Sequence, residues 1–175
     1  MAMTAFEILE LAEIDGLVEL KFNSFNDHRG KIWTTYNQKD LSSLLPDQLE
    51  FIHDKFTFSK KNVLRGIHGD AKSWKLVTCV YGKIYQVVID LRDNSPTFKK
   101  WKSFQIGNDD NRSILIPPNF GNAFLVLSDE AVYHYKLAYH GDYFDAAQQF
   151  TYAWNDPSIN IDWPCDNPIL SSRDQ

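Results

Sequence analysis

Hydrophobic and polar residues alternate over short stretches separated by turn residues, the period-2 pattern of half-buried β-strands. The clearest case is KLVTCVYGKIYQVVIDLR, residues 75–92, in which Tyr81-Gly82-Lys83 divides two β-rich runs. This segment predicts a β-hairpin. Similar patterns predict further strands over residues 17–22, 31–36, 51–59, 102–105, 113–116, 123–127 and 131–139.

Helical signals are short and few. One covers residues 41–45, just before Pro46, and a further turn is predicted near residues 145–149. Three prolines in residues 154–175 predict an extended or irregular segment that crosses the barrel. Many short strands without strand–helix alternation or a repeat predict an all-β sandwich or barrel, with a jelly roll as the favoured form. No boundary is visible, so residues 1–175 are expected to form one domain.

Composition narrows the classes of function. The chain has 175 residues, 43% of them hydrophobic, which is enough for one well-filled core. Its 18 basic and 23 acidic residues give a surface that is poorly suited to nucleic acid, so no nucleic-acid partner is expected. No apolar run approaches the roughly 20 residues of a membrane helix, and the acidic N-terminal segment does not resemble a signal peptide. We therefore expect a cytoplasmic protein without a membrane partner.

The two cysteines do not indicate a disulfide framework or a zinc site. Cys79 and Cys165 have neither CxxC spacing nor a neighbouring histidine cluster. Cys79 lies in the apolar run KLVTCVYG, which favours a buried core thiol over a nucleophile.

The densest group of chemically useful residues is NVLRGIHGD, residues 62–70. Here Arg65, His68 and Asp70 surround two glycines, which would let the backbone approach a ligand closely. A metal-binding jelly roll of the cupin type would carry an HxH pair, then a glutamate and a later histidine. This chain has HGD, with Asn122 where the later histidine could stand, so no metal is expected. A lone histidine on a strand is more often structural than catalytic.

Several motifs together resemble the dTDP-4-dehydrorhamnose 3,5-epimerase family in order and spacing. They are FNDHRGKIW, VLRGIHGD, KLVTCVYGKIYQVVIDLRDNSPTF, ILIPPNFGNAFLVLS, VYHYKLAY, WNDPSINIDWP and ILSSRD, and they span nearly the whole chain. The resemblance implies a cupin-type jelly roll with a few short helices, a homodimer, and an isomerase without a metal or organic cofactor. Such an enzyme inverts carbons beside a C4 ketone, which requires a base, a stabilised enolate and an acid on the opposite ring face.

The resemblance also assigns catalytic roles. His68 falls on the family's base, and Asp174 on the carboxylate that orients its imidazole. Lys75 matches the lysine near the C4 oxygen, and Tyr135 the tyrosine that donates a proton from the opposite face. Without the resemblance, Asp174 would be interpreted as a solvated charge, Lys75 as an outward lysine and Tyr135 as core packing.

Substrate-binding roles follow from the same comparison of motifs. Arg29 and Arg65 match arginines that grip the diphosphate, a task suited to the planar guanidinium. The alternative for both is surface ion pairing. Tyr139 matches a further pocket tyrosine with a supporting role.

Three departures from the family pattern change the expected substrate. In IPPNFGNAF the family's second pocket histidine is replaced by Asn122, which cannot carry a proton near neutral pH. HGD replaces the usual HYQ and shortens the loop before Lys75, which predicts a different or larger sugar. In FIHDKFTFS, His53 and Lys55 replace a glutamine and an asparagine that contact the nucleotide, which argues against thymidine.

These departures resemble a narrower branch, the bacterial epimerases that act on GDP-linked 4-keto-heptoses in capsular polysaccharide synthesis. The strings LRGIHGD, KLVTCVYG, IPPNFGN and QFTYAWND carry this resemblance. The sequence thus favours a GDP-4-keto-heptose epimerase that inverts C3, or both C3 and C5. Two alternatives stay open: a dTDP-4-dehydrorhamnose 3,5-epimerase of dTDP-rhamnose synthesis, and a non-catalytic sugar-nucleotide-binding jelly roll. The retained His68, Asp174, Lys75 and Tyr135 argue against the last.

Overall fold

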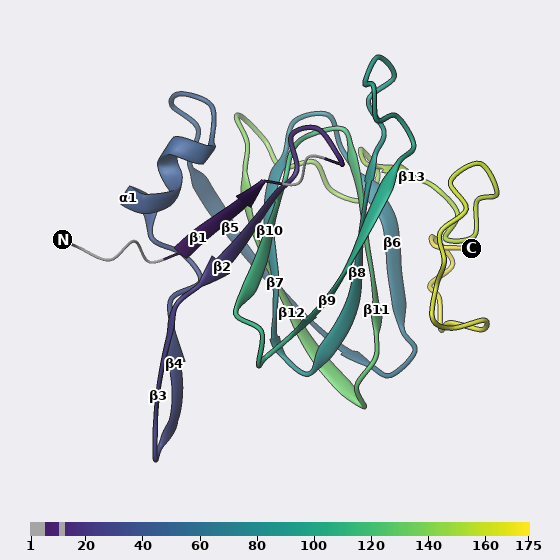
Figure 1. Ribbon diagram of the computed structural model, residues 1–175. Coiled ribbons are helices and arrows are strands. Elements are labelled where there is room, and N and C mark those ends of the chain that lie inside the picture. Colours follow the sequence, from purple (N-terminus) through teal and green to yellow (C-terminus); the bar gives the residue numbers. More distant parts are fainter. Residues whose placement is uncertain (1–5, 11–12) are drawn as a thin grey trace.

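Two antiparallel sheets face each other across the interior of the molecule (Figure 1). The computed structural model describes residues 6–10 and 13–175. The first sheet has the order β1 (Phe6–Glu10), β2 (Val18–Phe22), β10 (Arg112–Ile116), β7 (Trp74–Tyr81), β12 (Glu130–Ala138) and β5 (Phe51–Lys60). The second has the order β13 (Phe150–Thr151), β6 (Leu64–Gly69), β11 (Phe120–Val126), β8 (Lys83–Asp90) and β9 (Trp101–Gly107). The all-β prediction is confirmed.

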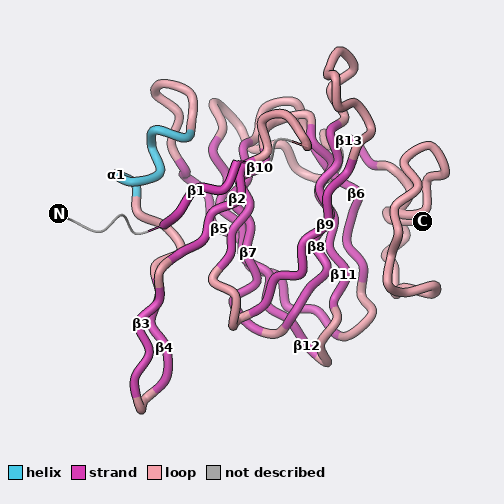
Figure 2. Tube along the Cα trace, in the orientation of Figure 1, coloured by secondary structure: helices cyan, strands magenta, loops and turns pink. Residues whose placement is uncertain are grey.

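A separate hairpin leaves the barrel. It consists of β3 (Ser24–Asp27) and β4 (Gly30–Trp33), and it projects away from both sheets (Figures 1 and 2). β4 is shorter than the predicted strand over residues 31–36, because its pairing with β3 covers only four residues and the chain then turns into a helix.

The one α-helix of the described residues, α1 (Gln38–Leu41), begins three residues before the predicted helical segment. Its start is fixed by Asn37, whose side chain accepts a hydrogen bond from the backbone N–H of Lys39. The chain continues as a 3-10 helix over Ser42–Leu44, and Leu41 is buried. The turn predicted at residues 145–149 is also present. Within the described residues, no helix has the length and apolar character needed to cross a membrane.

The strand β6 was not predicted, because its glycines and charged residues interrupt the alternation of NVLRGIHGD. A Cβ on Gly66 would lie 2.4 Å from the Ala123 Cβ, and one on Gly69 would lie 2.3 Å from the Phe120 carbonyl oxygen. The two glycines thus let β6 pack closely against β11, and the approach of their backbone to a ligand stays a prediction.

Apolar side chains fill much of the space between the sheets. Alternate residues of β7 face the interior: Lys75 lines a cavity, and Val77 and Cys79 lie in the core. Cys79 is buried, as predicted, and burial raises the pKa of its thiol to about 11. Cys79 is thus a thiol at neutral pH and a poor nucleophile.

Residues 154–175 form an irregular segment beside β6, as the prolines predicted (Figure 1). The segment is held by an isolated parallel bridge between Val63 and Ile169, and the Leu64 N–H donates to the Ile169 carbonyl. This attachment brings the last residues of the chain back to the barrel interior. Asp174 is 2% exposed, although it is the penultimate residue of the sequence.

Candidate active site

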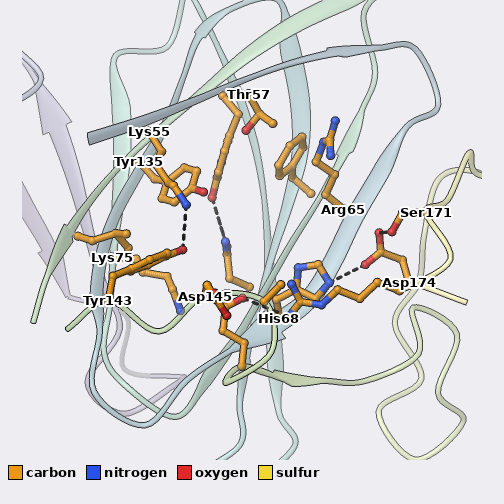
Figure 3. A pocket seen from close by; sticks show the side chains of 17 residues that line it. Lys55, Thr57, Arg65, His68, Lys75, Tyr135, Tyr143, Asp145, Ser171 and Asp174 are labelled. Atoms are coloured by element: carbon orange, nitrogen blue, oxygen red, sulfur yellow. Dashed lines mark hydrogen bonds and ion pairs between the residues drawn. The ribbon is translucent and has the colours of Figure 1, made fainter. Parts of the chain in front are cut away.

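A cavity of about 510 Å³ lies between the two sheets. Side chains enter it from β5, β6, β7, β11 and β12, from the segment before β13 and from the C-terminal segment (Figure 3). Seven of the ten predicted site residues line it: Lys55, Arg65, His68, Lys75, Asn122, Tyr135 and Asp174.

His68 and Asp174 form the closest acid–base pair in the cavity. The His68 Nε2 atom lies 2.6 Å from Asp174 Oδ1 (Figure 3). The Ser171 hydroxyl donates to the other carboxylate oxygen at 2.7 Å. Burial would raise the pKa of Asp174, but the contacts with His68, Ser171 and the Gly66 N–H outweigh it and hold that pKa below its ordinary value. Asp174 is therefore an anion at neutral pH, and it fixes the orientation of the imidazole.

Lys75 reaches the cavity from β7, in the sheet that faces His68. Its side chain is 8% exposed, and its Nζ lies 3.3 Å from Asp70 Oδ2. Burial lowers the pKa of Lys75, and the Asp70 charge offsets part of that effect. Asp70 is itself held by the Lys72 and Ser73 N–H groups, which donate to its Oδ1 at 3.0 and 2.6 Å.

Tyr135 comes from β12, next to Lys75 in the same sheet. Its register partners are Lys55 on β5 and Val77 on β7, so its side chain faces His68 across the cavity. Burial raises the pKa of Tyr135, although the nearby charges of Lys55 and Arg65 oppose the shift. The hydroxyl therefore keeps its proton at neutral pH and is a potential donor.

A neutral hydrogen-bond network occupies the position of the family's second histidine. The Gln86 amide nitrogen donates to Asn122 Oδ1 at 2.6 Å and lies 3.0 Å from the carbonyl oxygens of Val87 and Ala123. The Asn122 amide nitrogen donates to the Tyr133 hydroxyl at 3.1 Å. Sequence reasoning missed Gln86, which is fully buried and lies on a strand predicted only as core.

The residues that replace the family's glutamine and asparagine contact tyrosines of residues 139–143. Lys55 donates to the Tyr143 hydroxyl at 3.0 Å, with its Nζ 4.3 Å from the ring centroid (Figure 3). The His53 Nδ1 atom lies 3.1 Å from the Tyr139 hydroxyl. His53 and Tyr139 do not line the cavity; they form an aromatic group with Tyr143 beside it.

The two predicted arginines have different positions. Arg65 lines the cavity, and its Nε donates to Ser59 Oγ at 3.0 Å. Arg29 is far from this cavity in the fold, on the projecting hairpin, where it pairs with Asp27 at 2.6 Å. Arg173 also lines the cavity and was not predicted, because a lone arginine near the end of a chain gives no signal in the sequence. It is held by Gln149 and Thr151.

The arrangement suits proton transfer on either side of a small ligand. A histidine held by a carboxylate faces a protonated tyrosine and a buried lysine across one cavity, and cationic side chains surround them. No group of three or more potential metal ligands occurs within residues 6–10 and 13–175.

Comparison with known proteins gives consistent matches. The sequence profile described as dTDP-4-dehydrorhamnose 3,5-epimerase matches residues 11–175. The chain is 37% identical to a dTDP-4-dehydrorhamnose 3,5-epimerase of Shigella flexneri, over 93% of this chain and 90% of that protein. It is 32% identical to a dTDP-4-dehydrorhamnose 3-epimerase of Streptomyces niveus, over 93% of this chain and 78% of that protein.

A solved structure extends the similarity to three dimensions. The dTDP-6-deoxy-D-glucose-3,5-epimerase of Legionella pneumophila, crystallised with dTDP-4-keto-L-rhamnose, superposes with a TM-score of 0.88. It is 32% identical, and the match covers 97% of this chain and 89% of that one. The predicted cupin-type jelly roll is confirmed by this likeness.

Proposed function

This chain belongs to the dTDP-4-dehydrorhamnose 3,5-epimerase family, and we propose that His68, Lys75 and Tyr135 invert a carbon beside the C4 ketone of its substrate. As a member of the family it is an isomerase that acts on 4-keto sugar nucleotides. The alternative of a non-catalytic binding protein therefore has no support. The observation that carries the proposal is the 2.6 Å contact between His68 and Asp174 in a cavity shared with Lys75 and Tyr135.

The proposed reaction begins when His68 Nδ1 removes a proton from the carbon next to the ketone, because Nε2 faces Asp174. Asp174 stabilises the imidazolium that forms, since its anionic oxygen lies 2.6 Å from the ring. The charge moves to the C4 oxygen, where the Lys75 ammonium stabilises the enolate. Tyr135 returns a proton from the opposite face, because it stands on the facing sheet and keeps its hydroxyl proton.

The sugar nucleotide that the comparisons favour is a dTDP-linked 4-keto-6-deoxyhexose. The relatives named above act on dTDP sugars, and one of them is named as a 3-epimerase, the others as 3,5-epimerases. Arg65 and Arg173 provide guanidinium groups at the cavity that suit a diphosphate.

A second candidate is a GDP-linked 4-keto-heptose of capsular polysaccharide synthesis. Its support is the set of contacts made by the substituted residues. Lys55 and His53 are held by Tyr143 and Tyr139, so the nucleotide would meet an ammonium and an aromatic group where the family offers two amides. Asn122 similarly offers an amide in place of an imidazole.

The homodimer that the sequence predicts would explain the position of Arg29. The outward face of β5 exposes Ile52, Phe56 and Phe58 by 62%, 66% and 56%, and the hairpin exposes Phe25 and Ile32 to a similar degree. Apolar area of this kind favours contact with a second copy of the chain. Arg29 would then act at the diphosphate of the partner subunit. The substitution Phe56→Asp is expected to convert a dimer into monomers in light scattering; an unchanged mass would exclude this face from the interface.

Proton NMR in D₂O tests the proposal. Each candidate, dTDP-4-keto-6-deoxyglucose and a GDP-4-keto-heptose, is incubated with the protein while the C3 and C5 signals are followed. Loss at C3 alone indicates a 3-epimerase, and loss at both a 3,5-epimerase. His68→Asn is expected to abolish exchange while nucleotide affinity, measured by calorimetry, stays within about threefold. Full exchange in that variant would exclude His68 as the base, and no exchange of either sugar by the unaltered protein would refute the function.

A further inference from the structure

We propose that Asp70 is a positioning residue for catalysis, which holds Lys75 at the cavity and keeps its amine in the charged form that stabilises an enolate. This inference rests on the proposed function. It concerns a residue with no assigned role, at a position where the family's HYQ motif carries glutamine and this chain has HGD.

Local structure makes Asp70 a rigid partner. Its Oδ1 accepts from the Lys72 and Ser73 N–H groups, and its own carbonyl oxygen accepts from the Asn119 N–H at 2.8 Å. With Oδ1 occupied in this way, Oδ2 is directed at Lys75 Nζ, 3.3 Å away. Only four residues separate Asp70 from Lys75, so the short loop turns the carboxylate back onto the start of β7.

Burial makes the charge of Lys75 depend on its ion pair with Asp70. The Asp70 side chain is fully buried, and that of Lys75 is 8% exposed. A lysine in such surroundings loses its proton readily, because burial disfavours the ammonium, whereas a carboxylate at this distance favours it. An uncharged amine at the C4 oxygen would stabilise an enolate far less than an ammonium.

The other ionisable groups of the cavity do not replace Asp70. The facing anions are Asp145, before β13, and Asp174, which is bound to His68. The cations are Lys55 on β5 of the same sheet, and Arg65 on β6 and Arg173 of the C-terminal segment on the facing side; all three disfavour a further positive charge. The remaining groups are His68 and the tyrosines Tyr133, Tyr135 and Tyr143. Among the described residues, Asp70 is the only carboxylate within ion-pair distance of Lys75.

The pH profile of kcat for Asp70→Asn is the first test, because asparagine keeps the shape and removes the charge. The basic limb reports loss of the ammonium, so without the anion it is expected to move to lower pH by about one unit or more. At a pH above the basic limbs of both proteins, kcat should be lower by about tenfold for a shift of one unit, and the deficit should narrow as the pH is lowered. Asp70→Glu, which keeps the charge, is expected to restore the limb. A basic limb in Asp70→Asn at the position of the unaltered protein would overturn the proposal.

A double-mutant cycle separates this role from general structural damage. If Asp70 acts through Lys75, Asp70→Asn should reduce kcat little further in a Lys75→Gln background. If the kcat losses of the two single substitutions instead multiply in the double variant, Asp70 acts independently of Lys75, and the proposal is overturned. Circular dichroism checks folding of each variant. Should asparagine not be accommodated, Asp70→Ser leaves room for water and is expected to give the same shift of the basic limb.

The unaltered protein serves as the control for function. If it exchanges the substrate's C3 proton in D₂O and Asp70→Asn keeps its full pH profile, only the role of Asp70 fails. If the unaltered protein exchanges no proton of any 4-keto sugar nucleotide, the proposed function itself fails.

Discussion

Substitution of Asp174 by asparagine tests the least expected part of the site, a catalytic carboxylate at the penultimate residue. Asparagine keeps the size of the side chain and can still accept from Ser171, but it removes the charge 2.6 Å from His68 Nε2. A hydrogen bond to a charged group contributes about 1.5–3 kcal/mol. If that interaction stabilises the imidazolium formed in the transition state, its loss corresponds to a fall in kcat of about 10- to 150-fold.

The assay is C3 proton exchange under single turnover, with saturating substrate, so that product release does not hide the proton transfer. Ser171→Ala is the matched control, because it removes a hydrogen bond from the same carboxylate and leaves the contact with His68 in place. Its loss is expected to be only a few-fold. Exchange by Asp174→Asn within about twofold of the unaltered protein, or equal losses in both variants, would refute the role of the charge.

Two further predictions concern the acid and the stability of the barrel. Tyr135→Phe is expected to let exchange continue while the inverted product accumulates much more slowly, which NMR of the product resolves; unimpaired inversion would assign the acid to another group. Asp90 is fully buried and accepts from Arg92, Ser95 and Thr97; burial raises its pKa, but these bonds hold that pKa well below its ordinary value. The stabilising effect of the Asp90 carboxylate is thus present above about pH 4 and lost as the pH falls further. Urea unfolding should show that Asp90→Asn is less stable than the unaltered protein by about 2–3 kcal/mol at pH 7. Between pH 7 and pH 3 the variant should lose less stability than the unaltered protein. Parallel pH dependence in the two proteins would contradict this.

The strands that the sequence predicted are those in which apolar and polar residues alternate, most clearly the hairpin of β7 and β8. β7 and β8 follow this pattern because their inward residues enter the core. β6 was missed because it is the strand that carries Arg65 and His68 to the cavity, and its glycines accommodate β11. Functional residues displaced the apolar ones whose periodicity would have marked the strand.

The site could be predicted only through the family resemblance. His68 and Asp174 are 106 positions apart in the numbering, and no periodicity relates residues at that separation. Their contact depends on the bridge between Val63 and Ile169, which attaches the C-terminal segment to the barrel. The resemblance gave Asp174 its role, whereas Asp70 and Arg173 acquire significance only from their neighbours in space.

The replacement of a histidine by Asn122 illustrates what one sequence position conceals. Backbone carbonyls only accept hydrogen bonds, so those of Val87 and Ala123 oblige Gln86 to turn its amide nitrogen toward them and toward Asn122 Oδ1. Asn122 must then present its own N–H groups to Tyr133 and the cavity. At Asn122 the cavity wall thus presents an amide in place of an imidazole. The sequence alone did not indicate that Asn122 has a buried partner, because Gln86 lies 36 positions away on a neighbouring strand.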